Sequence, residues 1–143
     1  MSATLTFANY SDQDWSSLDI TSDWVSYRAF WSSVLQFATA DEASEVYFRL
    51  DQGEDCLTVR VDGEKFAMEP PPVEFRQVLH TAACKIASGG TFAFLMRRCI
   101  RLFTRSCYIG DILLEAYQGT ERWAVYWETY GVRMARKLSE SCV

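Results

Sequence analysis

Four closely spaced arginines are the feature of this 143-residue sequence best suited to binding an anion. An arginine guanidinium is planar and permanently charged, and its paired N–H groups match the oxygens of a phosphate or a carboxylate. Apolar and aromatic residues stand between the four, so an anionic lipid, an acidic protein or a single-stranded nucleic acid could bind there. The alternative is a strand with one solvated face whose arginines form salt bridges. The four residues are Arg97, Arg98, Arg101 and Arg105.

His80 and Cys84 are a second pair that could do chemistry. They are four positions apart in a segment with helical spacing, so they share a face and could bind a metal or form a cysteine nucleophile with its base. A zinc site needs two more ligands, and His80 is the only histidine of the chain. Nothing nearby indicates an oxyanion hole. We therefore expect a buried histidine and a core thiol, with no catalytic residue, metal or cofactor. An enzyme that uses Cys84 and His80 is the least favoured alternative.

The composition predicts one folded domain in a reducing compartment. Apolar residues make up 49% of the chain and aromatic residues 15%, which is enough for a packed core. No apolar stretch approaches the roughly 18 residues that a membrane-spanning helix needs. The five cysteines are odd in number and widely spaced, with no C-x-x-C pair. This pattern predicts free thiols and a cytoplasmic location.

The charge is unevenly distributed along the chain. Residues 1–74 carry 14 acidic and 4 basic side chains, whereas residues 75–143 carry 5 acidic and 10 basic ones. The net charge of -5 argues against nucleic acid as the partner, because neutralisation of phosphates supplies most of the nonspecific affinity for it. The two halves either mix their charges on one surface or bring a basic patch to an acidic partner or a second copy of the chain.

The elements that would position these residues begin with an irregular arm over residues 1–21 and a helix from Trp24 to about Thr39. Alternating apolar residues then predict strands over 45–50, 56–61 and 64–68, the last two joined by a two-residue turn at Asp62-Gly63. The prolines at 70–72 end the third strand, and a second helix follows and ends at Gly89-Gly90.

The remainder of the chain predicts mostly strands. Residues 92–96 and 99–107 favour strands, although the four-residue spacing of Arg97, Arg101 and Arg105 would also suit a helix. Gly110 is expected to break the segment. A hairpin is predicted from residues 112–117 and 123–127, and a short basic helix over 130–138. The fold class is thus α+β, a two-layer domain over residues 22–143 with an antiparallel sheet and helices packed on one face.

Residues 24–90 resemble the N-terminal domain that precedes the core of the motor ATPases of type II secretion and type IV pilus assembly. That domain reads helix, A-S-D-I-H, hairpin, R-x-R-x-D-G, strand, prolines, helix. Here the matching segments are Ala43-Ser44-Glu45-Val46-Tyr47, Thr58-Val59-Arg60-Val61-Asp62-Gly63 and Pro70-Pro71-Pro72. The resemblance implies a regulatory or docking domain that packs against a neighbouring motor. It also implies that Arg60 can approach a bound nucleotide.

This sequence departs from the family at Glu45, Tyr47 and Thr58, where the family has Asp, His and Arg. It also contains no G-x-x-x-x-G-K-[ST] phosphate loop. We therefore expect a non-catalytic docking module without an ATPase core. It would bind a secretion or pilus component, or a second copy of itself, through Arg60 and the four arginines of residues 97–105. The alternative is a dimeric chaperone or adaptor for a secreted protein. Type III secretion chaperones have this size and acidity, and the order helix, three strands, helix, two strands, helix.

Overall fold

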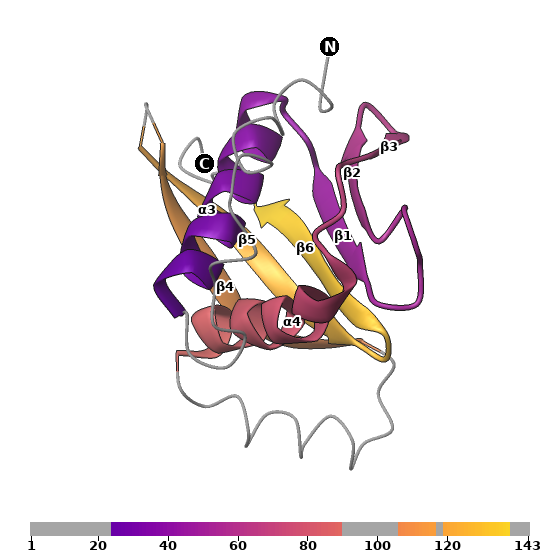
Figure 1. Cartoon of the computed structure of the whole chain (residues 1–143). Coiled ribbons are helices and arrows are strands. Elements are labelled where there is room, and N and C mark those ends of the chain that lie inside the picture. The colour runs from indigo at the N-terminus through magenta and orange to yellow at the C-terminus, as the bar shows by residue number, and fades with distance from the viewer. Residues whose placement is uncertain (1–23, 90–105, 117–118, 138–143) are drawn as a thin grey trace.

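The structure is a computed structural model that describes residues 24–89, 106–116 and 119–137 (Figure 1). Within these ranges two helices and six strands form an α+β fold, as the sequence predicts. The strands make one antiparallel sheet in the order β3-β2-β1-β6-β5-β4. In chain order the elements are α3 (Trp24–Ala40), β1 (Glu45–Arg49), β2 (Leu57–Val61), β3 (Glu64–Ala67), α4 (Val73–Ser88), β4 (Ser106–Ala116), β5 (Gly119–Glu128) and β6 (Gly131–Lys137).

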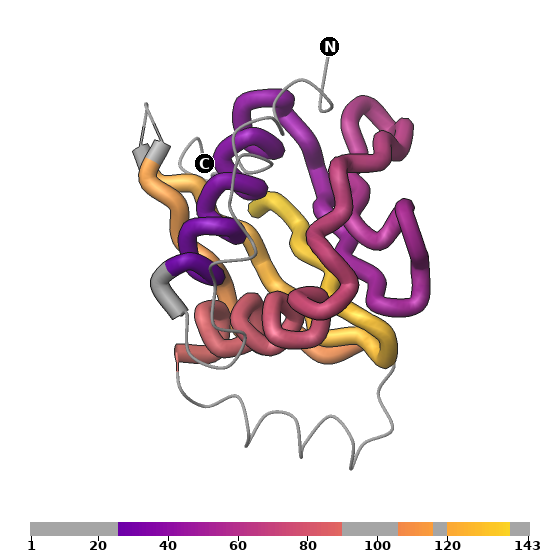
Figure 2. The backbone as a smooth tube through the Cα atoms, viewed as in Figure 1, coloured from indigo at the N-terminus to yellow at the C-terminus, as the bar shows by residue number. Residues whose placement is uncertain are grey.

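Both described helices cover the same face of the sheet, which confirms the predicted two-layer arrangement. Figure 1 shows α3 and α4 in front of β4, β5 and β6, and the backbone tube of Figure 2 shows the same arrangement. Side chains alternate along each strand, so Val46 and Phe48 of β1 are buried toward the helices. Tyr47 and Arg49 point the other way and are half-buried.

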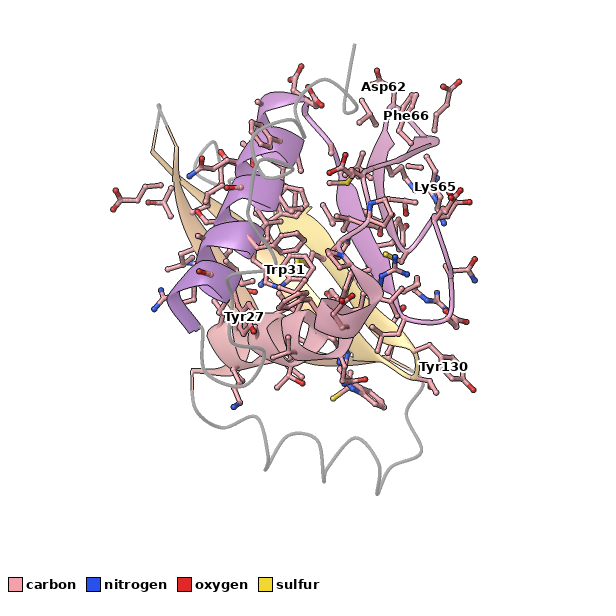
Figure 3. The ribbon with its side chains drawn as sticks, in the orientation of Figure 1. Tyr27, Trp31, Asp62, Lys65, Phe66 and Tyr130 are labelled. Atoms are coloured by element: carbon pink, nitrogen blue, oxygen red, sulfur yellow. The ribbon has the colours of Figure 1, made fainter. Side chains whose placement is uncertain are left out.

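Trp31 of α3 lies at the centre of the core between the helices and the sheet. It is 1% exposed, and its indole N–H donates a hydrogen bond of 2.8 Å to the Leu79 carbonyl oxygen of α4. Its ring meets Phe30 and Phe48 edge to face, with centroid distances of 5.1 and 5.2 Å. Figure 3 shows Trp31 and Tyr27 together in this region. One side chain therefore joins α3, α4 and β1.

Local chemistry explains where the first half of the fold turns. Asp62 and Gly63 have φ of 52° and 83°, which is the conformation that the predicted two-residue hairpin turn requires. Helix α4 begins after Pro72, carries Glu74 in its first turn, and ends at Gly89 in the left-handed conformation. The Gly89 N–H closes the helix by bonding to the Lys85 carbonyl oxygen.

The predicted C-terminal helix over 130–138 is wrong, because Gly131–Lys137 is strand β6. Val132 and Met134 are fully buried and alternate with Arg133 and Ala135, which is the period of a half-buried strand. β6 pairs with both β1 and β5 and so occupies the middle of the sheet. The favourable helix propensities of Met, Ala, Arg and Lys are overridden by this two-sided pairing.

Gly110 does not break the segment as predicted, since it lies inside β4 with φ of 144°. The register of the β4–β5 pair shifts between Tyr108 and Gly110, so the glycine forms a bulge within a continuous strand. The predicted hairpin of 112–117 and 123–127 is confirmed as part of β4 and β5. The strand prediction for 99–107 is confirmed at Ser106 and Cys107. Its remainder, the 92–96 strand and the arm over 1–21 lie outside the described residues.

Cys56 and Cys84 are buried free thiols, as predicted, but Cys107 is disulfide-bonded, so the expectation of free cysteines fails there. Among the described helices, none is long and apolar enough to cross a membrane.

Candidate functional site

The face of the sheet opposite α3 and α4 is the candidate functional site, and we call it the open face. Strand alternation and register place its side chains in cross-strand rows, one of which runs Thr58, Tyr47, Arg133, Tyr126 and Tyr108. Charged and aromatic residues dominate this surface. Its charged members are Glu45, Arg49, Arg60, Lys65, Asp111, Glu115, Arg122, Glu128, Arg133 and Lys137.

Glu45 is the centre of one half of the open face. Its carboxylate accepts a hydrogen bond from Arg133 at 3.1 Å and one from the Tyr47 hydroxyl, and it pairs with Arg60 at 3.2 Å. Burial alone would raise the pKa of Glu45, but the bonds from Tyr47 and Arg133 and the charges of the two arginines bring it below its ordinary value. The Glu45 carboxylate is therefore ionised, and each of its two oxygens accepts a hydrogen bond from a neighbouring side chain.

Asp111 is the central carboxylate in the other half of the open face. It accepts hydrogen bonds from Tyr108 at 2.7 Å, Arg122 at 3.1 Å and Lys137 at 3.2 Å. Burial alone would raise the pKa of Asp111, but these three hydrogen bonds bring it below its ordinary value. The Asp111 side chain is 12% exposed, against 56% for Arg122 and 43% for Lys137. The cations thus lie outermost, above the carboxylate that holds them.

Each tyrosine of the open face supports a cation. Lys65 lies 4.2 Å from the centroid of the Tyr47 ring, and Arg133 lies 4.3 Å from that of Tyr126. Lys137 lies 5.1 Å from the centroid of Tyr108. Such cation–π contacts fix long flexible side chains in place over an aromatic base. The open face consequently presents ordered positive charge.

A pocket of about 460 Å³ opens on this face beside the hairpins of β1, β2 and β3. Thr58 and Ala67 are cross-strand neighbours with small side chains, which leaves space next to the Tyr47 ring. Residues of the β1–β2 loop complete the pocket. The lining residues are Tyr47, Arg49, Gln52, Asp55, Thr58, Lys65 and Ala67.

Of the residues that the sequence points to, Arg60 lies on the open face and is about one third exposed. It pairs with Glu45, donates to the Gly63 carbonyl oxygen at 3.0 Å, and faces Lys65 across the β2–β3 pair. The four arginines Arg97, Arg98, Arg101 and Arg105 lie outside the described residues.

Sequence reasoning missed five cations that the fold brings to the same face as Arg60. Two of them sit on the strand that was predicted to be a helix, where reading the alternation of 131–137 would have found them. The five are Arg49, Lys65, Arg122, Arg133 and Lys137.

His80 and Cys84 are both buried on α4. The His80 Nε2–H donates to the Gly131 carbonyl oxygen at 3.1 Å, while its Nδ1 is buried without a hydrogen-bond partner. Burial raises the pKa of Cys84 to about 12, so its thiol is a poor nucleophile. Among the residues that the structure describes, no three His, Cys, Asp or Glu side chains are grouped to hold a metal ion. The geometry favours the core thiol and buried histidine over the enzyme alternative.

Burial of His80 makes the stability of the fold depend on pH. Burial lowers the pKa of His80 from its ordinary value of 6.5, and the bond to Gly131 opposes this only in part. The unfolded chain therefore takes up a proton before the folded one, so stability is full above about pH 6.5 and falls as the pH drops below it. We expect His80→Gln, which keeps a donor for Gly131 but cannot titrate, to flatten this fall.

The measurement is urea unfolding of both proteins between pH 7 and 5.5. A single proton contributes a slope of at most about 1.4 kcal/mol per pH unit. Glu45 and Asp111 have lowered pKa values, so their contribution is lost only at more acidic pH. If the free energy of unfolding fell equally steeply with pH in the wild type and in His80→Gln, the pH dependence could not be attributed to His80.

Comparison with known proteins finds neither a family model nor a curated protein that matches the chain.

Proposed function

We propose that the protein is a non-catalytic docking module that binds another protein through the open face of its sheet. The single observation that carries this proposal is the asymmetry of the sheet. One face is buried by both described helices, and the other presents ordered cations on tyrosine rings. Tyrosine and arginine are the residues that protein interfaces favour, since they combine large contact area with directional hydrogen bonds.

The proposed relatives remain the N-terminal domains of secretion and pilus motor ATPases. An antiparallel sheet, two helices on one of its faces and a partly exposed Arg60 are what this resemblance requires. Glu45 holds Arg60 in position, and it stands where the family has an aspartate. The proposed partner is accordingly a secretion or pilus component.

The chaperone-like alternative receives less support. It calls for two strands and a helix after the second helix, whereas the described residues continue with β4, β5 and β6. The exposed large apolar residues within the described ranges are four, and only Tyr108 and Leu113 share an element, β4; the other two are Val73 on α4 and Tyr130 between β5 and β6. A cytoplasmic location is part of our proposal. The free thiols of Cys56 and Cys84 support it, and the disulfide at Cys107 is the observation against it.

Affinity capture from a lysate of the source organism, with mass spectrometry, tests the proposal through matched charge reversals. The test variant is Lys65→Glu/Arg122→Glu, which reverses two exposed cations at opposite ends of the open face. The control variant is Lys85→Glu/Arg28→Glu, which reverses one lysine and one arginine exposed on the helices. We expect a secretion or pilus component that the control variant retains and the test variant loses.

If both variants retained the captured partner, the partner would bind at a surface other than the open face. Recovery of no protein above background would contradict the docking function itself. A parallel variant, Arg97→Glu/Arg98→Glu/Arg101→Glu/Arg105→Glu, tests the surface predicted from the sequence alone. Sedimentation of each protein determines whether the partner is a second copy of the chain.

A further inference from the structure

The cations that line the pocket are less tightly paired with carboxylates than the other cations of the open face. Elsewhere the basic side chains are bonded to carboxylates, as Arg133 is to Glu45 and Lys137 to Asp111. Lys65 lines the pocket and makes no ion pair within the described part of the chain, where its contact is the Tyr47 ring. Its ammonium group is therefore available to an incoming anion.

Arg49, at the other end of the pocket, is held loosely. Its two carboxylate neighbours, Asp51 and Glu128, lie 3.7 and 3.8 Å away, beyond hydrogen-bonding distance. Its Nε atom is buried and has no hydrogen-bond partner. Arg49 thus adds positive charge to the lining of the pocket, and both of its ion pairs are longer than hydrogen bonds.

We propose that this pocket receives the acidic side chain of a peptide segment, whose carboxylate is bound by the ammonium group of Lys65. The inference rests on the proposed docking function and names the chemistry of the partner segment. Thr58 and Gln52, which also line the pocket, supply a hydroxyl and an amide for the polar groups of the peptide backbone. The volume of about 460 Å³ is within the range of ordinary ligand pockets and exceeds what one carboxylate needs, which leaves room for flanking residues.

Asp55 also lines the pocket and opposes the entry of any anion. A doubly charged phosphate would feel twice the repulsion from Asp55 and twice the attraction to Lys65 that a carboxylate feels, so inorganic phosphate is the competing occupant that the experiment below separates. A nucleic acid strand would need a continuous track of unpaired cations, and the neighbouring cations are already bonded to Glu45 and Asp111.

Fluorescence anisotropy with a labelled, end-blocked hexaglutamate peptide tests the proposal, with hexaglutamine as the uncharged reference. We expect hexaglutamate to bind, hexaglutamine not to bind, and the amide NMR signals of Tyr47, Thr58 and Ala67 to shift on titration. Lys65→Gln should weaken binding about fivefold, the upper range for one exposed ion pair. Ala67→Trp should weaken it by more than about tenfold, because an indole fills the pocket from an exposed position on the edge strand β3.

The matched control is Lys85→Gln, which removes an exposed lysine from α4 and should leave the affinity unchanged. Circular dichroism and the unfolding temperature establish that each variant is folded. Equal affinity of Lys65→Gln, Ala67→Trp and the wild type, or NMR shifts confined to the helices, would overturn the proposal. Binding of inorganic phosphate in preference to hexaglutamate would overturn the peptide occupant and assign the pocket to a phosphate.

The outcome separates this inference from the proposed function. If Lys65→Glu/Arg122→Glu loses the captured partner while Ala67→Trp retains it, the open face docks but the pocket does not. If hexaglutamate enters the pocket and no protein is captured, the carboxylate site stands without the docking function.

Discussion

Replacing Gly131 with alanine is expected to lower the free energy of unfolding by more than about 4 kcal/mol, the range of the most damaging single substitutions. Gly131 opens β6 opposite Arg49 of β1. A Cβ atom there would lie 1.9 Å from the Phe48 carbonyl oxygen and 2.9 Å from its carbon. These are backbone atoms of a paired strand, so they cannot move aside as a flexible side chain would. The β1–β6 pairing in the middle of the sheet would have to open.

Urea unfolding followed by circular dichroism measures this effect. The matched control is Gly53→Ala in the β1–β2 loop, where a Cβ atom would meet nothing within 4 Å. We expect that control to change the free energy of unfolding by less than about 0.5 kcal/mol. A Gly131→Ala protein with the wild-type midpoint would show that β1 and β6 do not approach each other as described.

Replacing Trp31 with alanine is expected to cost about 3–5 kcal/mol, the usual range for removing a buried tryptophan. The side chain is 1% exposed, so its removal leaves a cavity where α3, α4 and β1 meet. The substitution also deprives the buried Leu79 carbonyl oxygen of the indole N–H. Thermal and urea unfolding should both show the loss.

Trp31→Phe separates the two contributions, because it keeps an aromatic ring but removes the hydrogen bond. We expect it to cost about 1–3 kcal/mol, clearly less than alanine. A Trp31→Phe loss as large as that of Trp31→Ala would mean that the bond to Leu79, rather than packing, dominates at this site.

The first half of the fold was predictable because its signals are local. The alternation of 45–50 and 56–61, the Asp62-Gly63 turn and the glycines after the second helix each act over a few residues. The last strand carries a local alternation too, but that alternation competes with high helix propensity. Residues 131–137 contain good helix formers, and what makes them a strand is pairing with β1, distant in the sequence.

The candidate site was predictable only at Arg60. In the strand of 57–61, Arg60 points to the other face from the buried Val59 and Val61. Local alternation is enough to predict this. The pairing of Arg133 with Glu45 spans 88 positions of sequence and depends on the register of the β1–β6 pair, which no local pattern encodes. The pocket likewise depends on Ala67 and Thr58 meeting across the β2–β3 pair beside Tyr47 of β1.

The central position of β6 has a consequence for synthesis on the ribosome. Strands β1 to β3 and both described helices are translated before β6, yet β6 is the strand that joins β1 to β5. Until it emerges, the buried side chains Val46 and Phe48 lack their cross-strand neighbours Met134 and Val132. The nascent chain therefore exposes one unpaired edge of β1, and the sheet cannot be completed until β6 has been translated. Such a chain depends on protection from aggregation during that interval.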